Sequence, residues 1–387
     1  MAKSFQKGDF RSGYYRDQTF MMALGELTVE QFFAGLYSNP DINADPMSAG
    51  RQMGGHFATH SLDENYNWKD LTKQYNSSSD ISPTASQMPR LLGLAQASKI
   101  YRNIPELNST NFSNNGNEVA WGTIGNASTS EGLFFETINA AGVLQVPMVV
   151  SVWDDEYGIS VHAKHHTTKE NISEVLKGFQ RNEHTEGYEI LKVKGWDYSA
   201  LIDTYERASD IARKEHVPVI VHVNELTQPQ GHSTSGSHER YKDPERLAWE
   251  KENDCILKMR EWMIAHGIAD QEELTDLEKS IKRQVRQLKT KAWNNFLESI
   301  LHEREELVNL LQIVSNKSAN SPFINKLSDE LKSLEEPLRN DVISTARKSL
   351  RYLIHEDFEE KDHLKNWINH YFEVNQPKYS SHLYSAS

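Results

Sequence analysis

The sequence predicts an α/β fold in which a largely parallel sheet is flanked by helices, with a helical extension towards the C-terminus. Two stretches, residues 122–160 and 187–223, each indicate a strand, a helix and a second strand in succession. This order is typical of parallel sheets, whose neighbouring strands need a crossover connection. After residue 243 the composition changes to charged segments with helical periodicity, which predicts the extension.

The first strand-helix-strand unit begins with a short apolar strand that turns at Gly125-Asn126-Ala127. Apolar residues at helical spacing then predict an amphipathic helix: Leu133, Phe134, Ile138, Ala141 and Leu144. Pro147 ends this helix, and the apolar residues 148–152 predict a buried parallel strand that leads into the acidic loop 154–156. Both loops therefore leave the carboxyl ends of neighbouring strands, which is the edge where open α/β sheets bind ligands.

The rest of the chain divides by composition into three segments. Residues 1–242 are expected to form the α/β domain, residues 243–374 the helical extension and residues 375–387 a linker or tail. In the extension, helices are expected at residues 247–266, 270–302, 305–313, 327–334 and 338–354. Residues 76–80 are rich in Ser and Asn and are expected to form a loop.

Composition excludes several functional classes. The formal net charge of −13 argues against nucleic acid or an anionic membrane as a partner, since neither attracts an acidic protein. No apolar run approaches membrane-spanning length. The one cysteine, Cys255, cannot form an internal disulfide, which favours a reducing, cytoplasmic environment.

Polar groups at the two loops indicate a site for a divalent cation and a diphosphate. Asn126 follows the first strand and Asp155 follows the second. Magnesium takes a few oxygen ligands from a protein and shares the rest of its shell with phosphate. Asp155, Asn126 and the backbone carbonyl of Tyr157 are the expected ligands. The alternative is that Asn126 only forms the turn and that the acidic loop is a solvated surface.

These residues resemble the thiamine-diphosphate motif of the alpha subunit in the first component of 2-oxo acid dehydrogenase complexes. That motif is Gly-Asp-Gly or Gly-Glu-Gly, followed one helix and one strand later by Asn-Asn-x-Tyr. Here Asn126 stands at the acidic position, Asp155 at the second Asn and Ala127 at the last Gly. The exchange keeps one carboxylate and one carboxamide, so the resemblance implies thiamine diphosphate and magnesium in a thiamine-diphosphate-binding fold.

Further cofactor contacts are implied by the same resemblance. Tyr15 and Arg16 match a pair that reaches the diphosphate, and Ser82 and Thr84 match groups that contact the aminopyrimidine ring. An arginine suits phosphate because its planar donors bind two oxygens at once. Without the resemblance, the first pair reads as a surface arginine beside a core tyrosine, and residues 82–84 read as a helix start.

The loop around His232 completes the expected site. It resembles a loop that orders over the cofactor, and the resemblance assigns His232 a catalytic and diphosphate-binding role. Ser233 matches a regulatory phosphoserine position. Gln228 stands where relatives have an arginine, so one diphosphate contact is expected to be missing. A potassium site known in some relatives is also in doubt, because Ile81 replaces a serine beside Ser86 and Gln87.

The implied function is oxidative decarboxylation of a 2-oxo acid, with transfer of the acyl group to lipoyl on a second component. The resemblance also implies a beta subunit, which would supply the catalytic glutamate. Residues 50–57 are more similar to the branched-chain (2-oxoisovalerate) members than to the pyruvate members. A pyruvate-type alpha subunit and a non-catalytic scaffold relative stay open. The chain is expected to be truncated at its start, because family helices precede Tyr15.

Overall fold

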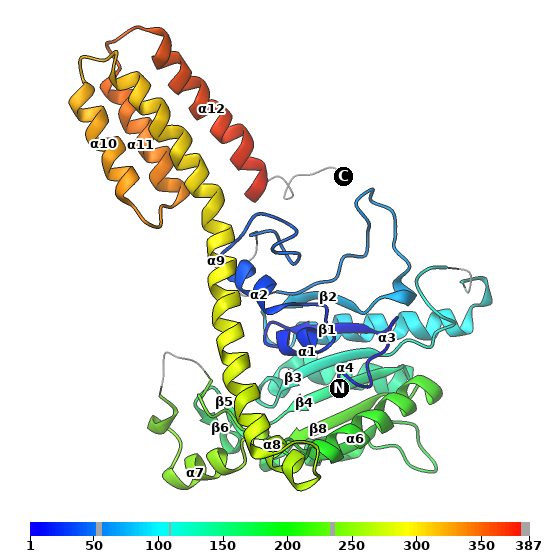
Figure 1. The fold of residues 1–387 in the computed structure, drawn as a ribbon. Coiled ribbons are helices and arrows are strands. Elements are labelled where there is room, and N and C mark those ends of the chain that lie inside the picture. The colour runs from blue at the N-terminus through cyan, green and yellow to red at the C-terminus, as the bar shows by residue number, and fades with distance from the viewer. Residues whose placement is uncertain (52–55, 108–109, 233–236, 381–387) are drawn as a thin grey trace. The chain divides into compact units, whose positions relative to one another are not determined.

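The computed structural model describes all residues except 52–55, 108–109, 233–236 and 381–387 (Figure 1). The chain forms two compact units. The first consists of Met1–Leu27 and His56–Ser280, and the second of Thr28–Gly55 and Ile281–Ser387. The boundary expected at residue 242 falls inside the first unit.

A six-stranded sheet forms the centre of the first unit, and it confirms the predicted α/β fold. Its strands are β1 (Phe10–Tyr14), β2 (Asn76–Ile81), β3 (Ala120–Gly125), β4 (Met148–Trp153), β7 (Glu189–Lys194) and β8 (Val219–Asn224). They lie in the order β2-β1-β3-β4-β8-β7, and every neighbouring pair is parallel. The carboxyl ends of β1, β3 and β4 therefore meet along one edge of the sheet.

Helices cover both faces of this sheet (Figure 1). On one face, α3 (Gln87–Asn103) and α4 (Gly132–Leu144) pack against β3 and β4 in a core of buried apolar residues. The fit is close at Gly122, where an added Cβ would lie 2.4 Å from Leu91 Cδ2. On the other face lies α6 (Tyr198–Asp210), whose Tyr205 hydroxyl lies 2.5 Å from Ser151 Oγ of β4.

Shorter elements complete the first unit. They are α1 (Gln18–Ala23), α5 (Ile172–Val175), α7 (Pro244–Glu252), α8 (Cys255–Ala265) and the hairpin of β5 (Tyr157–Gly158) and β6 (Val161–His162). The single helix expected at residues 247–266 is divided in two, because the Asp254 carboxylate accepts from the Leu257 amide and begins a new helix.

Strand β2 corrects the prediction of a loop at residues 76–80. Three of its polar residues, Asn76, Ser77 and Asp80, are buried yet hydrogen-bonded, so they are compatible with a strand. The side-chain amide of Asn76 donates to the Leu71 carbonyl. Arg11 of β1 donates to Ser77 Oγ and Asp80 Oδ1. Composition indicated a loop because it does not reveal partners supplied by a neighbouring strand.

The second unit contains α2 (Val29–Leu36), α10 (Ser321–Ser333), α11 (Arg339–Tyr352) and α12 (Glu359–Ser380). Together with the C-terminal part of α9 (Gln271–Ser315), the last three enclose an apolar core that includes Leu307, Leu311 and Leu364. Helix α9 is continuous where two helices were expected, since Glu303 and Arg304 favour helix. Helix α12 runs past residue 375, the expected start of the linker.

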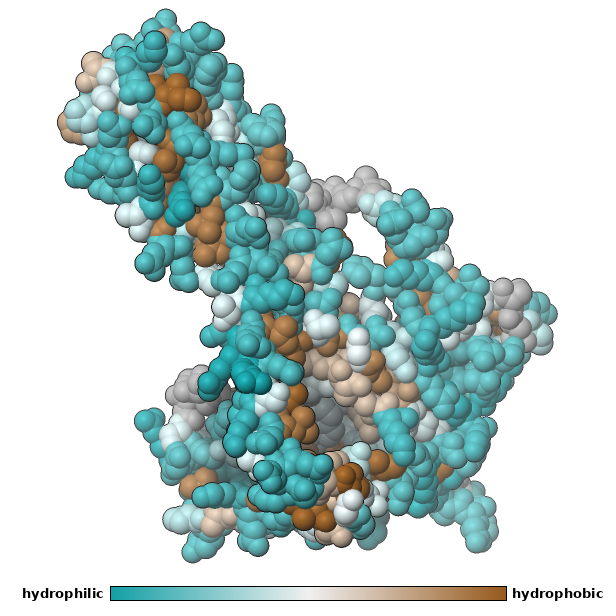
Figure 2. All heavy atoms as spheres, viewed as in Figure 1, coloured by the Kyte–Doolittle hydropathy of each residue, from teal (hydrophilic) through white to brown (hydrophobic). Residues whose placement is uncertain are grey.

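Polar side chains occupy most of the visible face of both units in Figure 2, with apolar side chains in smaller separate areas. Among the described residues, every helix falls short of the combined length and apolarity that crossing a membrane requires.

Candidate functional site

A pocket of about 430 Å³ opens where β1, β3 and β4 end. The residues predicted for the site that line it are Tyr15, Arg16, Thr84, Gly125, Asn126, Ala127, Asp155, Tyr157 and His232. Ser82 is not among the lining residues, and its hydroxyl instead hydrogen-bonds to His56 Nε2. Ser233, expected to be a modification site, lies outside the described residues.

Asn126 and Asp155 bring oxygen-bearing side chains to the lining of the pocket. The Asn126 amide donates to the Trp153 carbonyl over 3.1 Å, which joins the ends of β3 and β4. Its side chain is buried, and within the described part of the chain its Nδ2 has no hydrogen-bond partner. Asp155 Oδ1 accepts from the Tyr157 amide at 3.3 Å. Burial raises the pKa of the Asp155 carboxyl to about 6, while that bond and Lys242 act in the opposite direction.

The loop that carries Asp155 is fixed from the sheet by Asp154. Asp154 Oδ1 accepts from the Glu156 amide at 2.8 Å, and Oδ2 lies 2.8 Å from His222 Nε2. The other ring nitrogen of His222 lies 2.6 Å from Ser173 Oγ. All three side chains are buried. The backbone of Asp154 also bonds to Val223 and Leu226, so both ends of this residue are attached to β8 and the chain that follows it.

Arg16 adds a cationic side chain to the lining of the pocket. Arg16 Nη2 donates to the His232 carbonyl at 3.0 Å and lies 3.4 Å from His232 Nδ1. Burial, followed by the neighbouring Arg16 charge, lowers the pKa of His232, so its imidazole is neutral at pH 7. The turn that presents Arg16 is held by Asp17, whose Oδ2 accepts from the Tyr14 amide at 3.1 Å and from Thr123 Oγ1.

Two small residues of the lining, Ala127 and Gly158, lie close to each other. A Cβ added to Gly158 would lie 2.6 Å from the Cβ of Ala127, so the chain approaches itself closely at this point. Ala127 occupies the last position of the first motif and still permits this approach.

Several residues that support the site were missed in the sequence. Arg11 and Asp17 form a buried ion pair of 3.1 Å, and nothing in their local sequence indicates it. His222 offered a signal, since it is a lone histidine in the apolar strand Val219–Asn224. Arg246, which contacts the Asp155 loop, lies just before the helix expected at residues 247–266, and a charged residue in such a segment usually faces solvent.

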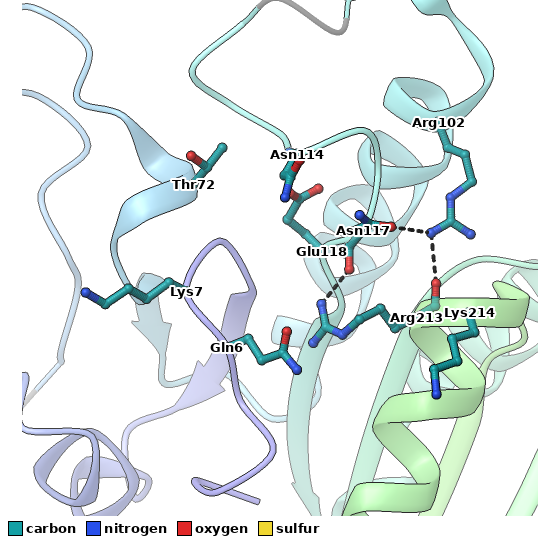
Figure 3. Close-up of a pocket in the computed structure, with 9 residues that line it drawn as sticks. All are labelled: Gln6, Lys7, Thr72, Arg102, Asn114, Asn117, Glu118, Arg213 and Lys214. Carbon is teal, nitrogen blue, oxygen red and sulfur yellow. Dashed lines mark hydrogen bonds between the residues drawn. The ribbon is translucent and has the colours of Figure 1, made fainter.

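A second cavity, of about 510 Å³, lies at the amino ends of β1 and β3 (Figure 3). Figure 3 shows Arg102 and Arg213 directed towards Asn117. Arg213 also pairs with the buried Asp9 at 2.8 Å, and Arg102 donates to the Arg213 carbonyl at 2.8 Å. Both arginines of this cavity are thus engaged with the protein itself, and the cavity lies away from the edge where ligands bind in such sheets.

The chain matches one protein family and is similar to several known proteins. The profile of a family described as "Dehydrogenase E1 component" matches residues 1–297. The chain is similar to the 2-oxoisovalerate dehydrogenase subunit alpha of Bacillus subtilis (strain 168), with 25% identity over 68% of this chain and 68% of the relative. The 2-oxoisovalerate dehydrogenase subunit alpha 1, mitochondrial, of Arabidopsis thaliana is 25% identical over 70% of this chain and 50% of the relative. The pyruvate dehydrogenase E1 component subunit alpha of Rickettsia bellii (strain RML369-C) is 25% identical over 45% of this chain and 51% of the relative. The chain therefore spans about half the length of the last two relatives.

Proposed function

The chain belongs to the dehydrogenase E1 component family and corresponds to its alpha subunits, and we propose that its pocket binds the diphosphate end of thiamine diphosphate together with magnesium. The family implies the cofactor. The observation that carries the proposal is the lining of the pocket, which brings the oxygen-bearing side chains of Asn126 and Asp155 into one cavity with Arg16 and His232.

The residues present suit this cofactor. A carboxylate, a carboxamide and a backbone carbonyl, from Asp155, Asn126 and Tyr157, form an oxygen donor set that a magnesium ion shared with phosphate accepts. The buried Nδ2 of Asn126 has no partner among the described residues, and a phosphate oxygen would satisfy it. Arg16 supplies a charged donor for the diphosphate.

In this proposal the pocket residues that this chain contributes bind or position the cofactor and the metal. When bound, thiamine diphosphate accepts the electron pair released by decarboxylation. Asp155 and Asn126 hold the metal, Arg16 balances part of the charge of the diphosphate, and His232 contacts it through a hydrogen bond. His232 is neutral at pH 7, so it acts as a hydrogen-bond donor or acceptor at the cofactor and adds no charge there. A beta subunit completes the site.

We propose a branched-chain 2-oxo acid of the 2-oxoisovalerate type as the substrate, with the acyl group passed to a lipoyl group on a second component. The names of two similar relatives, from Bacillus subtilis and Arabidopsis thaliana, support this substrate class. The pyruvate relative from Rickettsia bellii supports the alternative of a pyruvate-type subunit. Residues 52–55, part of the segment that resembled the branched-chain members, lie outside the described residues.

A second candidate function is a non-catalytic scaffold relative that binds the cofactor weakly. It is favoured by Asn126, Ala127 and Gln228, which line the pocket where the family pattern has an acid, a glycine and an arginine. The two candidates differ in cofactor affinity, which can be measured directly.

The test is a calorimetric titration of the full chain with thiamine diphosphate, with and without magnesium and with and without a beta subunit. Magnesium-dependent binding that strengthens with the beta subunit is the expected result. If the cofactor does not bind under any of these conditions, the proposed function is wrong and the scaffold candidate is favoured.

A further inference from the structure

Helix α7 contacts the loop that carries the proposed metal ligands through one arginine. Arg246 Nη2 donates to the Asp155 carbonyl at 2.9 Å, and Nη1 donates to the Glu156 carboxylate. The third donor, Nε, bonds to Glu250 Oε1 at 3.0 Å. The Arg246 side chain is only 14% exposed. Its guanidinium therefore joins the backbone and a side chain of the loop to the helix.

The guanidinium also packs against aromatic rings. Its Cζ lies 5.6 Å from the centroid of the Tyr157 ring and 4.6 Å from that of Trp249. Tyr157 is the residue whose carbonyl is the third proposed ligand. Arg246 thus contacts all three consecutive residues from Asp155 to Tyr157, two of which are proposed ligands.

Arg246 is also linked to a buried ion pair between Lys242 and Glu250. Lys242 Nζ lies 2.6 Å from Glu250 Oε1, and both side chains are 2% exposed. Glu250 Oε1 therefore accepts from Lys242 and from Arg246. Lys242 also lies 4.9 Å from the centroid of the Tyr157 ring. This arrangement fixes the direction in which Arg246 can point.

The charges of the loop explain why such a contact matters. Asp154, Asp155 and Glu156 are three successive carboxylates, which repel one another when ionised. Asp154 lies against His222, and Glu156 pairs with Arg246. Among the residues that the structure describes, Asp155 is the one carboxylate of the three with no ion pair, and it lines the pocket. Its two neighbours have side-chain partners within the protein, and Asp155 is left for a ligand.

We propose that Arg246 is a positioning residue that holds the Asp155–Tyr157 loop in the geometry needed to bind the metal. This inference rests on the proposed function and deepens it. Arg246 itself contacts neither metal nor cofactor. It acts by fixing the Asp155 carbonyl and withdrawing the Glu156 carboxylate from the site. A guanidinium is required because three donors in one plane serve three acceptors at once, whereas an ammonium group is a point charge.

The test measures the magnesium concentration at half-maximal binding of thiamine diphosphate, by calorimetry, in the full chain with its beta subunit. Direct Mn²⁺ binding, by electron paramagnetic resonance, is a readout independent of activity. Arg246→Gln should weaken metal binding by about tenfold or more, as is typical when a group that orients metal ligands is lost. Arg246→Lys should restore only part of this loss. Arg207→Gln is the matched control, because Arg207 pairs with Glu189 outside the pocket.

The parallel variant Asp155→Ala separates the inference from the proposed function. If Asp155→Ala loses metal binding while Arg246→Gln keeps the wild-type midpoint, the positioning role is wrong and the site stands. If Asp155→Ala also keeps that midpoint, the proposed metal site itself is wrong. A wild-type magnesium midpoint in Arg246→Lys would overturn the argument that the three coplanar donors of the guanidinium are required.

A purely structural role predicts a different pattern, in which the melting temperature falls and the metal midpoint does not change. Should Arg246→Gln fail to fold, Glu156→Gln tests the same contact from the other side, because the Glu156 side chain is 44% exposed. Weaker metal binding in Glu156→Gln supports the inference, and an unchanged midpoint overturns it.

Discussion

The imidazole of His222 and the carboxylate of Asp154 form a buried pair directly behind the proposed metal loop, with Nε2 and Oδ2 separated by 2.8 Å. His222 lies on β8, and Asp154 immediately follows β4. The next residue is Asp155. The pair therefore fixes the start of the Asp155 loop to strand β8. The loop is thus held by β8 on one side and by Arg246 of α7 on the other.

The first prediction concerns the energy of this pair. His222→Leu should lower the free energy of unfolding by about 3–5 kcal/mol, because it leaves a buried carboxylate without its partner. Adding Asp154→Asn should recover at least about 1 kcal/mol of that loss, since the buried charge is then removed as well. Urea unfolding of the single and double variants, followed by circular dichroism, measures both effects. Simple additivity of the two losses would show that the residues are not coupled.

The second prediction concerns the proposed metal ligand. Asp155→Ala should abolish magnesium-dependent binding of thiamine diphosphate, because it removes the carboxylate of the proposed donor set. The control is Glu131→Gln, since Glu131 also lines the pocket but has no assigned part in metal binding. Calorimetric titration of both variants checks this prediction. Wild-type affinity in Asp155→Ala would mean that the metal ligands have been misassigned.

The third prediction tests whether the exchange of acid and amide is compensated. The double variant Asn126→Asp with Asp155→Asn should bind cofactor and magnesium better than either single variant. Asp155→Asn alone leaves two amides, and Asn126→Asp alone places two buried carboxylates in one pocket, whereas the double variant restores one of each. The same titration measures all three proteins. Losses that add in the double variant would contradict compensation.

The central strands could be predicted from the sequence because they are short, mostly apolar runs between turns. Strands β3, β4 and β8 bury both faces, so their residues indicate a parallel sheet directly. Strand β2 was taken for a loop because Asn76, Ser77 and Asp80 are polar. Ser77 and Asp80 accept hydrogen bonds from Arg11 of β1, which lies far from them in the sequence.

The residues of the candidate site likewise fall into those that the sequence predicted and those that only the structure revealed. Asn126, Asp155 and His232 could be named because each belongs to a local motif at a strand end or in a loop. The residues that hold them, including His222 and Arg246, could not. Their role arises from contacts between segments that are distant in sequence, and a charged residue on a helix is by default expected to face solvent.

The fourth prediction concerns acid stability, and it depends on His216. Its Nε2 lies 2.9 Å from the Gly116 carbonyl, and the residue is buried. Burial lowers the pKa of His216 to about 4, with Arg102 and Lys99 acting in the same direction. Because the imidazole binds its proton more tightly in the unfolded chain, its contribution to stability is complete above pH 6.5. That contribution is lost as the pH falls towards 4.

His216→Asn should remove this part of the acid sensitivity. Asparagine tolerates the left-handed backbone at this position, where φ is 55°. Between pH 7 and pH 4.5 the wild type should lose about 1–2 kcal/mol more stability than the variant, after allowance for partial screening by solvent. Urea unfolding of both proteins at the two pH values measures the difference. The comparison must be made between the two proteins, because burial raises the pKa of Asp80 to about 6 and its contribution runs in the opposite direction. An equal loss in wild type and variant would show that His216 does not titrate in this range.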